Sequence, residues 1–247
     1  MGPSKPTAYE VSPFRFQSPT APDYPASVRS GALAMIPGME QRRPTDVPSS
    51  PPLAMTEWAD LPEDESGEWV DGHLVEEEMT DYLHEVVVLW FGAQFRAWLA
   101  DRGGFVGGSD AKFAVSPRRG RKPDLSVFLP GGRVPPARGL VRVPPDIIVE
   151  IVSLGPRDGR RDRVEKLNEY AAFGVRFYWI VDPDERSLQI FELSPEGRYV
   201  HALGVTGGIV DPVPGCPGLR LDLDALWTET DRLGPPSPDD EATWSPC

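Results

Sequence analysis

The sequence predicts a mixed α/β fold in which helices flank a central β-sheet. Two segments, 80–101 and 160–173, carry apolar residues at helical spacing. Short runs of β-branched and aromatic residues lie before, between and after them, separated by Gly- and Pro-rich breaks. The resulting order is a hairpin, a helix, three strands, a long strand, a second helix and further strands. That order is typical of a mixed sheet with helices on its faces.

The predicted domain opens with a hairpin and a long helix. In residues 68–76, Asp71-Gly72 lies between two short apolar runs, which is a strong hairpin signal. The helix 80–101 follows, and Gly103-Gly104 ends it. Its predicted buried stripe consists of Leu83, Val86, Val87, Trp90, Ala93 and Ala97, widened by Val88, Phe91, Phe95 and Trp98. So much apolar surface predicts that the helix is largely buried.

The remaining elements are short strands around the second helix. In the helix 160–173 the predicted core stripe is Val164, Leu167 and Ala171, and Gly174 ends the helix. The predicted strands are 105–107, 111–115, 124–129, 146–152, 176–182 and 187–193, followed by the run RYVHAL and by a last strand with a short helical turn in 218–227.

Composition divides the chain into three parts. Residues 1–55 carry eleven of the 29 prolines and no hydrophobic periodicity, which predicts a disordered extension. We hypothesise that translation starts at Met55 or at Met39, so that part of this extension lies upstream of the true start. The folded domain is expected over 56–227. Residues 228–247 read as a disordered acidic tail.

Cysteine content and hydropathy predict a cytoplasmic protein. The two cysteines, Cys216 and Cys247, are too few and too far apart for a disulfide framework or a zinc site. No apolar run approaches the length of a membrane span, and the first residues lack the apolar core of a signal peptide. A reduced protein without membrane contact is therefore expected.

The charge distribution leaves a nucleic-acid partner open. The net charge of −13 argues against one, but the charge is uneven. Residues 57–85 hold twelve acidic and no basic side chains, whereas residues 96–142 hold ten Lys or Arg against three Asp, including the run PRRGRK at 117–122. A run of charge is commonly just a solvated face, so this pattern alone establishes no partner.

Two carboxylates in neighbouring predicted strands are candidate metal ligands. Glu150 lies in the apolar run PDIIVEIVS, where an unpaired carboxylate would cost several kcal/mol. Asp124 opens the preceding strand, directly after a proline. Together they would form an oxygen-rich site for a hard divalent cation such as Mg²⁺. The alternative is that Asp124 is an ordinary strand opener and that Glu150 pairs with an arginine.

A lysine on the second helix extends this candidate site. Lys166 shares a helical face with Asp162 and Tyr170, offset from the core stripe. From that face its amine could reach Glu150 at the end of the strand. The alternative is an ordinary surface pair between Asp162 and Lys166, which would contribute only a few tenths of a kcal/mol.

The motif KPDLSVF at 122–128 is followed by an ordered series of residues: Pro145-Asp146, Glu150, Ser153, Asp162, Lys166, Tyr170, Gly174-Val175, Tyr178-Trp179 and Asp182-Pro183. Further support comes upstream from EWVDGHLVEEEM and downstream from GLRLDLDALW. On these motifs, residues 57–227 resemble the Uma-type restriction endonuclease family, a bacterial branch of the PD-(D/E)XK nuclease superfamily.

The resemblance implies a restriction-endonuclease-like core and a metal-dependent site. In it, Asp124, Glu150 and the main-chain carbonyl of Ile151 would bind Mg²⁺ or Mn²⁺, and Lys166 would stabilise charge that develops on the scissile phosphate. The superfamily usually places this lysine two residues after the glutamate, where this sequence has Val152. The lysine would therefore act from the helix.

Further residues carry over with less specific roles. Glu68 would be an extra ligand or a structural partner, and His84 would be either a hydrogen-bonding residue near the site or a core histidine. Asp162 and Tyr170 would support the site from the helix. Tyr178 and Trp179 are expected in the core rather than as a platform for base stacking. The candidate DNA-contacting residues are Arg118, Arg119, Arg121 and Lys122.

The leading hypothesis is a Mg²⁺-dependent DNA endonuclease, which by analogy with other nucleases would be a homodimer. The alternative is a catalytically degenerate module that keeps the nuclease fold to bind DNA or a protein partner. A glycosidase that uses the carboxylate pair ranks far behind, because no sugar-binding cleft is evident. The position of Lys166 discriminates between the endonuclease and the degenerate module. A distance of about 4 to 5 Å or less from its Nζ to the carboxylate of Asp124 or Glu150 would indicate an assembled site.

Overall fold

The computed structural model describes residues 52–62, 67–75, 81–153 and 159–234, the side chains of 159–163 excepted. The chain divides into two compact units, Met1–Pro48 and Ser49–Cys247, and all described residues belong to the second. Most of the predicted Pro-rich extension (1–55) and the end of the predicted tail therefore lie outside the described residues. None of the described helices is long and apolar enough to cross a membrane.

The described unit is a mixed α/β domain, which confirms the predicted class. Its helices are α1 (Met55–Ala59), α2 (Tyr82–Leu99), α3 (Gly159–Phe173) and α4 (Leu223–Thr230). Its strands are β1 (Glu68–Val70), β2 (His73–Val75), β3 (Phe105–Gly107), β4 (Phe113–Ser116), β5 (Arg119–Arg121), β6 (Leu125–Phe128), β7 (Ile147–Ile151), β8 (Phe177–Asp182), β9 (Ser187–Leu193), β10 (Tyr199–Val205), β11 (Ile209–Val210) and β12 (Leu221–Asp222).

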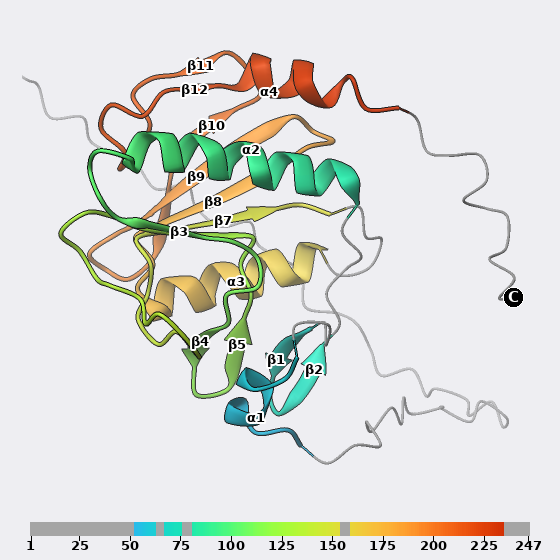
Figure 1. Cartoon of the computed structure of the whole chain (residues 1–247), viewed down its shortest axis with the longest axis vertical. Coiled ribbons are helices and arrows are strands. Elements are labelled where there is room, and N and C mark those ends of the chain that lie inside the picture. Colours follow the sequence, from blue (N-terminus) through green and yellow to red (C-terminus); the bar gives the residue numbers. More distant parts are fainter. Residues whose placement is uncertain (1–51, 63–66, 76–80, 154–158, 235–247) are drawn as a thin grey trace, which may run out of the picture. The chain divides into compact units, whose positions relative to one another are not determined.

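A six-stranded sheet forms the centre of the domain, in the order β10-β9-β8-β7-β6-β3. Its neighbouring strands are antiparallel except for β7 and β8, which run parallel. A parallel pair needs a crossover connection, and α3 supplies it. Helices α2 and α3 cover opposite faces of the sheet (Figure 1). The domain therefore has two apolar layers, one under each helix.

The alternation of β7 decides which way Glu150 faces. Ile147, Val149 and Ile151 belong to the apolar layer that includes α2, whereas Ile148 belongs to the layer that includes α3. Side chains along a strand alternate between the two faces of the sheet. Glu150 consequently faces α3, the helix that carries Lys166.

The buried face of α2 differs from the predicted stripe. Its buried side chains are His84, Val87, Val88, Phe91, Phe95 and Leu99, whereas the predicted members Ala93 and Ala97 are exposed. Burial of phenylalanine removes far more apolar area from water than burial of alanine. The rotation of α2 about its own axis that buries Phe91 and Phe95 is therefore preferred.

Helix α3 also differs from the prediction. The predicted core residue Val164 is 62% exposed, while Tyr170 is fully buried. Leu167 is partly buried against the layer under α3. The predicted stop at Gly174 is confirmed, because this glycine has a φ of +92°, which glycine adopts without strain.

A second, four-stranded sheet has the order β2-β1-β5-β4. The hairpin expected at Asp71-Gly72 joins β1 to β2 and is confirmed. Strand β5 was not predicted, because its sequence RGR lacks apolar residues. Its glycine, Gly120, lies against the indole ring of the fully buried Trp58 from α1.

The C-terminal boundary lies further along than predicted. Helix α4 runs to Thr230, beyond the expected domain end at 227, and the indole of Trp227 donates a hydrogen bond to Thr206 O (2.9 Å). The predicted acidic tail therefore begins with ordered helix. Residues 235–247 lie outside the described residues.

Candidate active site

Strand pairing brings Asp124 and Glu150 to the same edge of the central sheet. Strands β6 and β7 are antiparallel, with Leu125 opposite Val149. The residue before β6 and the residue after Val149 therefore lie side by side. In Figure 1 this edge lies on the right, where β7 ends near the N-terminal ends of α2 and α3.

Both carboxylate oxygens of Glu150 accept hydrogen bonds from α3. Lys166 Nζ donates to Oε2 at 3.1 Å, and the hydroxyl of Tyr170 donates to Oε1 at 2.6 Å. The two donors are one helical turn apart, so they share a face of α3. The side chains of Glu150 and Lys166 are each 13% exposed. The lysine therefore reaches the strand glutamate, as an assembled site requires.

Burial and neighbouring charges set the ionisation of Glu150. Burial raises its pKa to about 8, Lys166 opposes this increase, and the negative charges of Asp124 and Glu68 add to it. Burial also raises the pKa of the Tyr170 hydroxyl well above its ordinary value, so this group remains a hydrogen-bond donor. The site is thus rich in negative charge and poorly hydrated.

Asp124 is held by one donor from the sheet and one from α2. The main-chain N–H of Ile151 donates to its Oδ2 at 2.7 Å, and Nε2 of His84 lies 3.2 Å from its Oδ1. His84 is positioned by the start of α2, where its own N–H donates to Asp81 Oδ1 (2.8 Å). Burial lowers the pKa of His84, but the neighbouring carboxylates of Asp124 and Glu85 together outweigh burial and raise it overall.

Glu68 adds a third buried carboxylate, contributed by β1. Its Oε1 lies 3.5 Å from Lys166 Nζ and accepts a hydrogen bond from the main-chain N–H of Lys122 (3.2 Å). Its Oε2 accepts a hydrogen bond from the guanidinium of Arg121. Arg121 is only 3% exposed and also donates to Glu169 Oε2 at 2.7 Å. The second sheet therefore contributes directly to the surroundings of Lys166.

The four candidate DNA-contacting residues differ widely in exposure. The side chain of Arg118 is 77% exposed and pairs with Asp71, whereas that of Arg119 is 23% exposed and pairs with Asp71 and Glu169. Lys122 is 9% exposed and lies 3.7 Å from Asp110. Arg121 is turned inward to Glu68 and Glu169. Burial alone would lower the pKa of Arg121, but those two glutamates raise it, so the buried guanidinium stays charged.

The oxygen donors suited to a metal ion are few. Over the part of the chain that the structure describes, no group of three or more His, Cys, Asp or Glu side chains is gathered for metal binding. Asp124 and Glu150 are two carboxylates at the same end of the central sheet, and each carboxylate has about four lone-pair positions. Hard cations such as Mg²⁺ bind proteins through one or two carboxylates and complete their shell with water and substrate phosphate. The donor set therefore fits such an ion.

Some residues remain unplaced, and others were not foreseen. Asp162 belongs to α3, but its side chain lies outside the described residues. Tyr178 and Trp179 are buried in the core, as expected. Sequence reasoning did not identify Glu169 and took Arg121 for a surface residue. The signal that was available is the spacing of Arg119 and Arg121, because residues two apart in a strand share a face.

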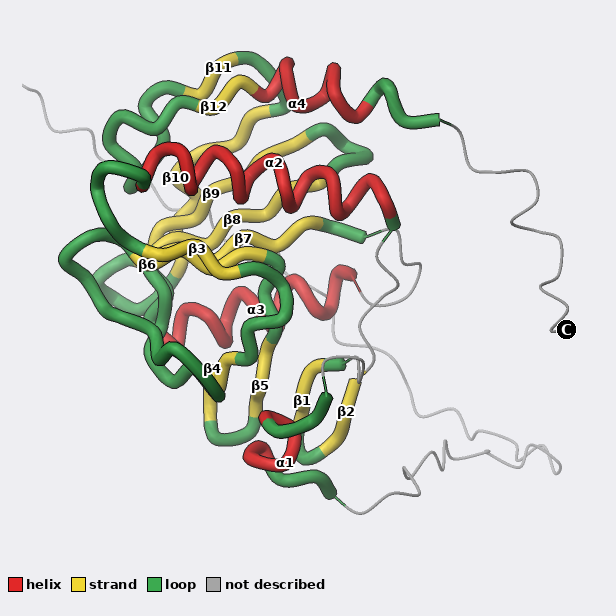
Figure 2. The backbone as a smooth tube through the Cα atoms, in the orientation of Figure 1, coloured by secondary structure: helices red, strands yellow, loops and turns green. Residues whose placement is uncertain are grey.

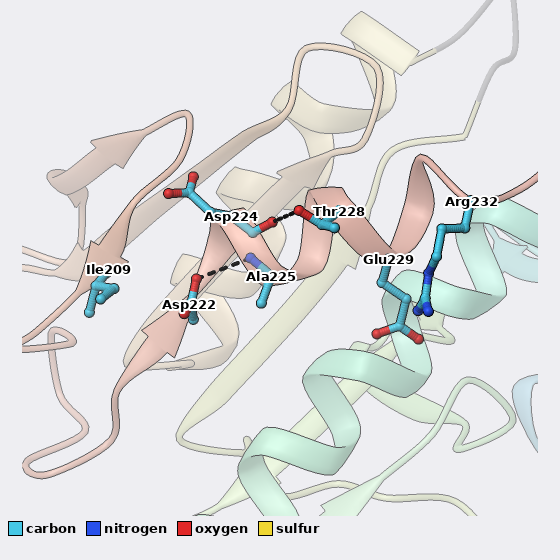
Figure 3. A pocket seen from close by; sticks show the side chains of 7 residues that line it. All are labelled: Ile209, Asp222, Asp224, Ala225, Thr228, Glu229 and Arg232. Atoms are coloured by element: carbon cyan, nitrogen blue, oxygen red, sulfur yellow. Dashed lines mark hydrogen bonds between the residues drawn. The ribbon is translucent and has the colours of Figure 1, made fainter.

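A separate surface pocket lies beside α4, and Figure 3 shows the side chains that line it. Asp222 and Asp224 use their carboxylates locally, accepting from Ala225 N (3.0 Å) and Gly208 N (2.7 Å). The pocket contains none of the predicted site residues and is lined by Ile209, Asp222, Asp224, Ala225, Thr228, Glu229 and Arg232.

Known proteins share this fold. The model of the Uma2 family, described as "Putative restriction endonuclease", matches residues 54–224. Among solved structures, the chain is similar to "a putative nuclease belonging to DUF820 from Anabaena variabilis ATCC 29413". The TM-score is 0.57 and the identity 19%, over 72% of this chain and 99% of that chain. Likeness at this identity shows the fold alone, and it confirms the expected restriction-endonuclease-like core. No curated protein matches the sequence.

Proposed function

This chain belongs to the Uma2 family of restriction-endonuclease-like proteins, and we propose that it is a metal-dependent endonuclease that hydrolyses phosphodiester bonds in DNA. The observation that carries the proposal is the hydrogen bond of 3.1 Å between Lys166 Nζ and Glu150 Oε2. It joins a cation to a buried carboxylate beside Asp124, even though the strand position usual for such a lysine is Val152. This contact favours an enzyme over a degenerate binding module.

Asp124, Glu150 and the main-chain carbonyl of Ile151 are the proposed ligands of Mg²⁺ or Mn²⁺. When bound, the ion supplies positive charge at the scissile phosphate and lowers the pKa of a water molecule. Its binding would also offset the cost of an ionised Glu150, whose pKa burial raises to about 8.

The remaining groups position these ligands or provide charge. Lys166 holds an ammonium group beside Glu150, where it can stabilise negative charge on the reacting phosphate. Tyr170 orients the Glu150 carboxylate by donating to its Oε1. His84 and the Ile151 N–H hold the two oxygens of Asp124. Because these donors are already in place, the site does not have to reorganise during the reaction.

DNA contact is proposed for Arg118, Arg119 and Lys122. These residues lie in or next to strand β5 of the second sheet, and Lys122 is two residues before Asp124. Arg121 is not retained among them, because its guanidinium pairs with buried glutamates. The expected homodimer stays a prediction, which light scattering coupled to size-exclusion chromatography would check.

Plasmid cleavage with Mg²⁺ or Mn²⁺ tests the proposed function. We expect the wild type to nick or linearise supercoiled DNA and Glu150→Gln or Lys166→Ala to lose about 100-fold or more of the rate, since each removes charge used in the transition state. Glu192→Gln is the matched control, because Glu192 forms a half-exposed ion pair with Arg176 at 3.5 Å, outside the site.

Two outcomes would contradict the proposal. Full activity in both site variants would remove Glu150 and Lys166 from the reaction. Absence of cleavage by the wild type with either ion, combined with retained DNA binding, would favour the degenerate module instead.

A further inference from the structure

We propose that Glu68 is a positioning residue for the catalytic lysine, and that Arg121 anchors Glu68 in this role. The small sheet that carries both residues would then be part of the active site. This inference rests on the proposed function and extends it to residues outside the metal-binding pair.

The ammonium group of Lys166 lies between two carboxylates. Its Nζ is 3.1 Å from Glu150 Oε2 and 3.5 Å from Glu68 Oε1. A lysine side chain has four flexible bonds, and a single ion pair leaves much of that freedom. The second carboxylate, that of Glu68 from the other sheet, restricts the amine to positions between the two carboxylates.

Glu68 is itself held rigidly. Its side chain is 7% exposed, its Oε2 accepts from the Arg121 guanidinium, and its Oε1 accepts from Lys122 N at 3.2 Å. Strands β1 and β5 pair with Trp69 opposite Gly120, so the next step of this register places Glu68 opposite Arg121. The pairing of the two strands therefore determines where the Glu68 carboxylate lies.

Arg121 connects this arrangement back to the helix that carries the lysine. Its Nε donates to Glu169 Oε2 at 2.7 Å, and Glu169 lies three residues after Lys166 in α3. Residues three apart in a helix share a face. Arg121 thus fixes Glu68 and the local position of α3 with the same guanidinium, which sets the distance that Lys166 has to span.

The contacts of Glu68 favour positioning over metal binding. One oxygen is paired with Arg121, and the other faces Lys166 and the Lys122 N–H. A carboxylate that already balances two cations gains less from a further one than Asp124 does, whose described partners are a main-chain N–H and an imidazole. Glu68 is therefore expected to act through Lys166.

A double-mutant cycle between Glu68→Gln and Lys166→Met tests the inference, with single-turnover plasmid cleavage as the readout. In the wild-type background we expect Glu68→Gln to lower the cleavage rate roughly tenfold, because the amine loses its second anchor. In the Lys166→Met background the same change should cost less than about twofold, because no amine remains to be positioned. The Mg²⁺ concentration for half-maximal rate should stay within about twofold. Glu192→Gln again serves as the control.

Different results would overturn the inference. If Glu68→Gln raises the half-saturating Mg²⁺ concentration about tenfold and saturating Mg²⁺ restores the rate, Glu68 is a metal ligand. If the two losses multiply, Glu68 acts independently of Lys166. Absence of cleavage by the wild type would refute the proposed function together with the positioning role, whereas multiplicative losses in an active enzyme refute the inference alone.

Urea unfolding of the same four proteins tests the ion pair without catalysis. Glu68 keeps Arg121 and Lys166 keeps Glu150 when the other partner is removed, but the attraction between Glu68 and Lys166 is lost in either single variant. The two changes should therefore be non-additive by roughly tenfold in the unfolding equilibrium constant. Additive effects on unfolding would overturn the pairing of Glu68 with Lys166.

Discussion

At the scale of single residues, Glu150 shows how an apolar strand can accommodate a carboxylate. Both of its oxygens have donors, Lys166 and Tyr170, yet its pKa is still raised from 4.5 to about 8, first by burial and further by Asp124 and Glu68. The folded protein therefore keeps the Glu150 proton to a higher pH than the unfolded chain does. This stabilisation is fully present below pH 4.5 and is lost as the pH rises towards 8.

Glu150→Gln should remove this contribution to the pH dependence of stability. Without metal, the wild type should lose stability relative to the variant between about pH 5 and pH 8.5, by an amount on the order of a few kcal/mol, because only the wild type has to ionise a buried group. Urea unfolding at several pH values in the presence of a chelator measures the difference. Parallel stability curves for the two proteins would show that Glu150 ionises normally in the fold.

At the scale of elements, the three residues of strand β5 contribute both to core packing and to the surroundings of the site. Arg119 and Arg121 share the face that meets α3, where both donate to Glu169 (2.9 and 2.7 Å). Gly120 between them faces the other way and lies against Trp58. An added Cβ at Gly120 would overlap the Trp58 ring. Helix α1 can pack on this sheet only because the middle residue has no side chain.

Gly120→Ala is therefore expected to destabilise the domain by about 1 to 3 kcal/mol, the usual cost of overpacking a core. Urea unfolding at neutral pH measures this loss. Gly108→Ala is the matched control, because a Cβ at Gly108 would meet no atom within 4 Å. Its effect should stay within about 0.5 kcal/mol. Equal stability of Gly120→Ala and the wild type would show that Trp58 can move aside at no cost.

At the scale of the whole domain, the two ends of the central sheet have different chemistry. Asp124 and Glu150 lie where β6 begins and β7 ends. The loop 129–146 between these strands leaves and rejoins the sheet at its opposite end (Figure 2). Arg133 in this loop donates to Gly174 O (3.5 Å), directly after the C-terminal end of α3. The basic segment 117–142, continuous in sequence, is thus divided in space, and Arg133 lies away from the site.

Charge removal at the two ends should therefore affect DNA binding differently. Arg118→Ala combined with Lys122→Ala should weaken binding and reduce the slope of log K against log salt by about 1 for each phosphate that is no longer neutralised. Arg133→Ala should leave that slope unchanged, because Arg133 contacts Gly174 O beyond the C-terminal end of α3. Fluorescence anisotropy with labelled duplex DNA at several salt concentrations measures both. An equal effect of the two changes would contradict the proposed DNA path.

The amino-acid sequence by itself determined the class of the fold and most of its elements. Hydrophobic periodicity and turn residues are local properties, and they sufficed for the hairpin at Asp71-Gly72, for α2 and α3, and for the strand that carries Glu150. The ordered series of polar residues also singled out Asp124, Glu150 and Lys166. The rotation of each helix escaped this reasoning, because it depends on which large side chains find room against the sheet.

Only the tertiary structure decided how the charges are paired. Arg121, Glu68 and Glu169 come from three elements that are distant in sequence, and no local pattern distinguishes a buried arginine from one on the surface. Their pairing follows from the register of β1 with β5 and from the return of α3 across the sheet. A buried charge needs a partner close in space, and only the folded chain specifies which residues those are.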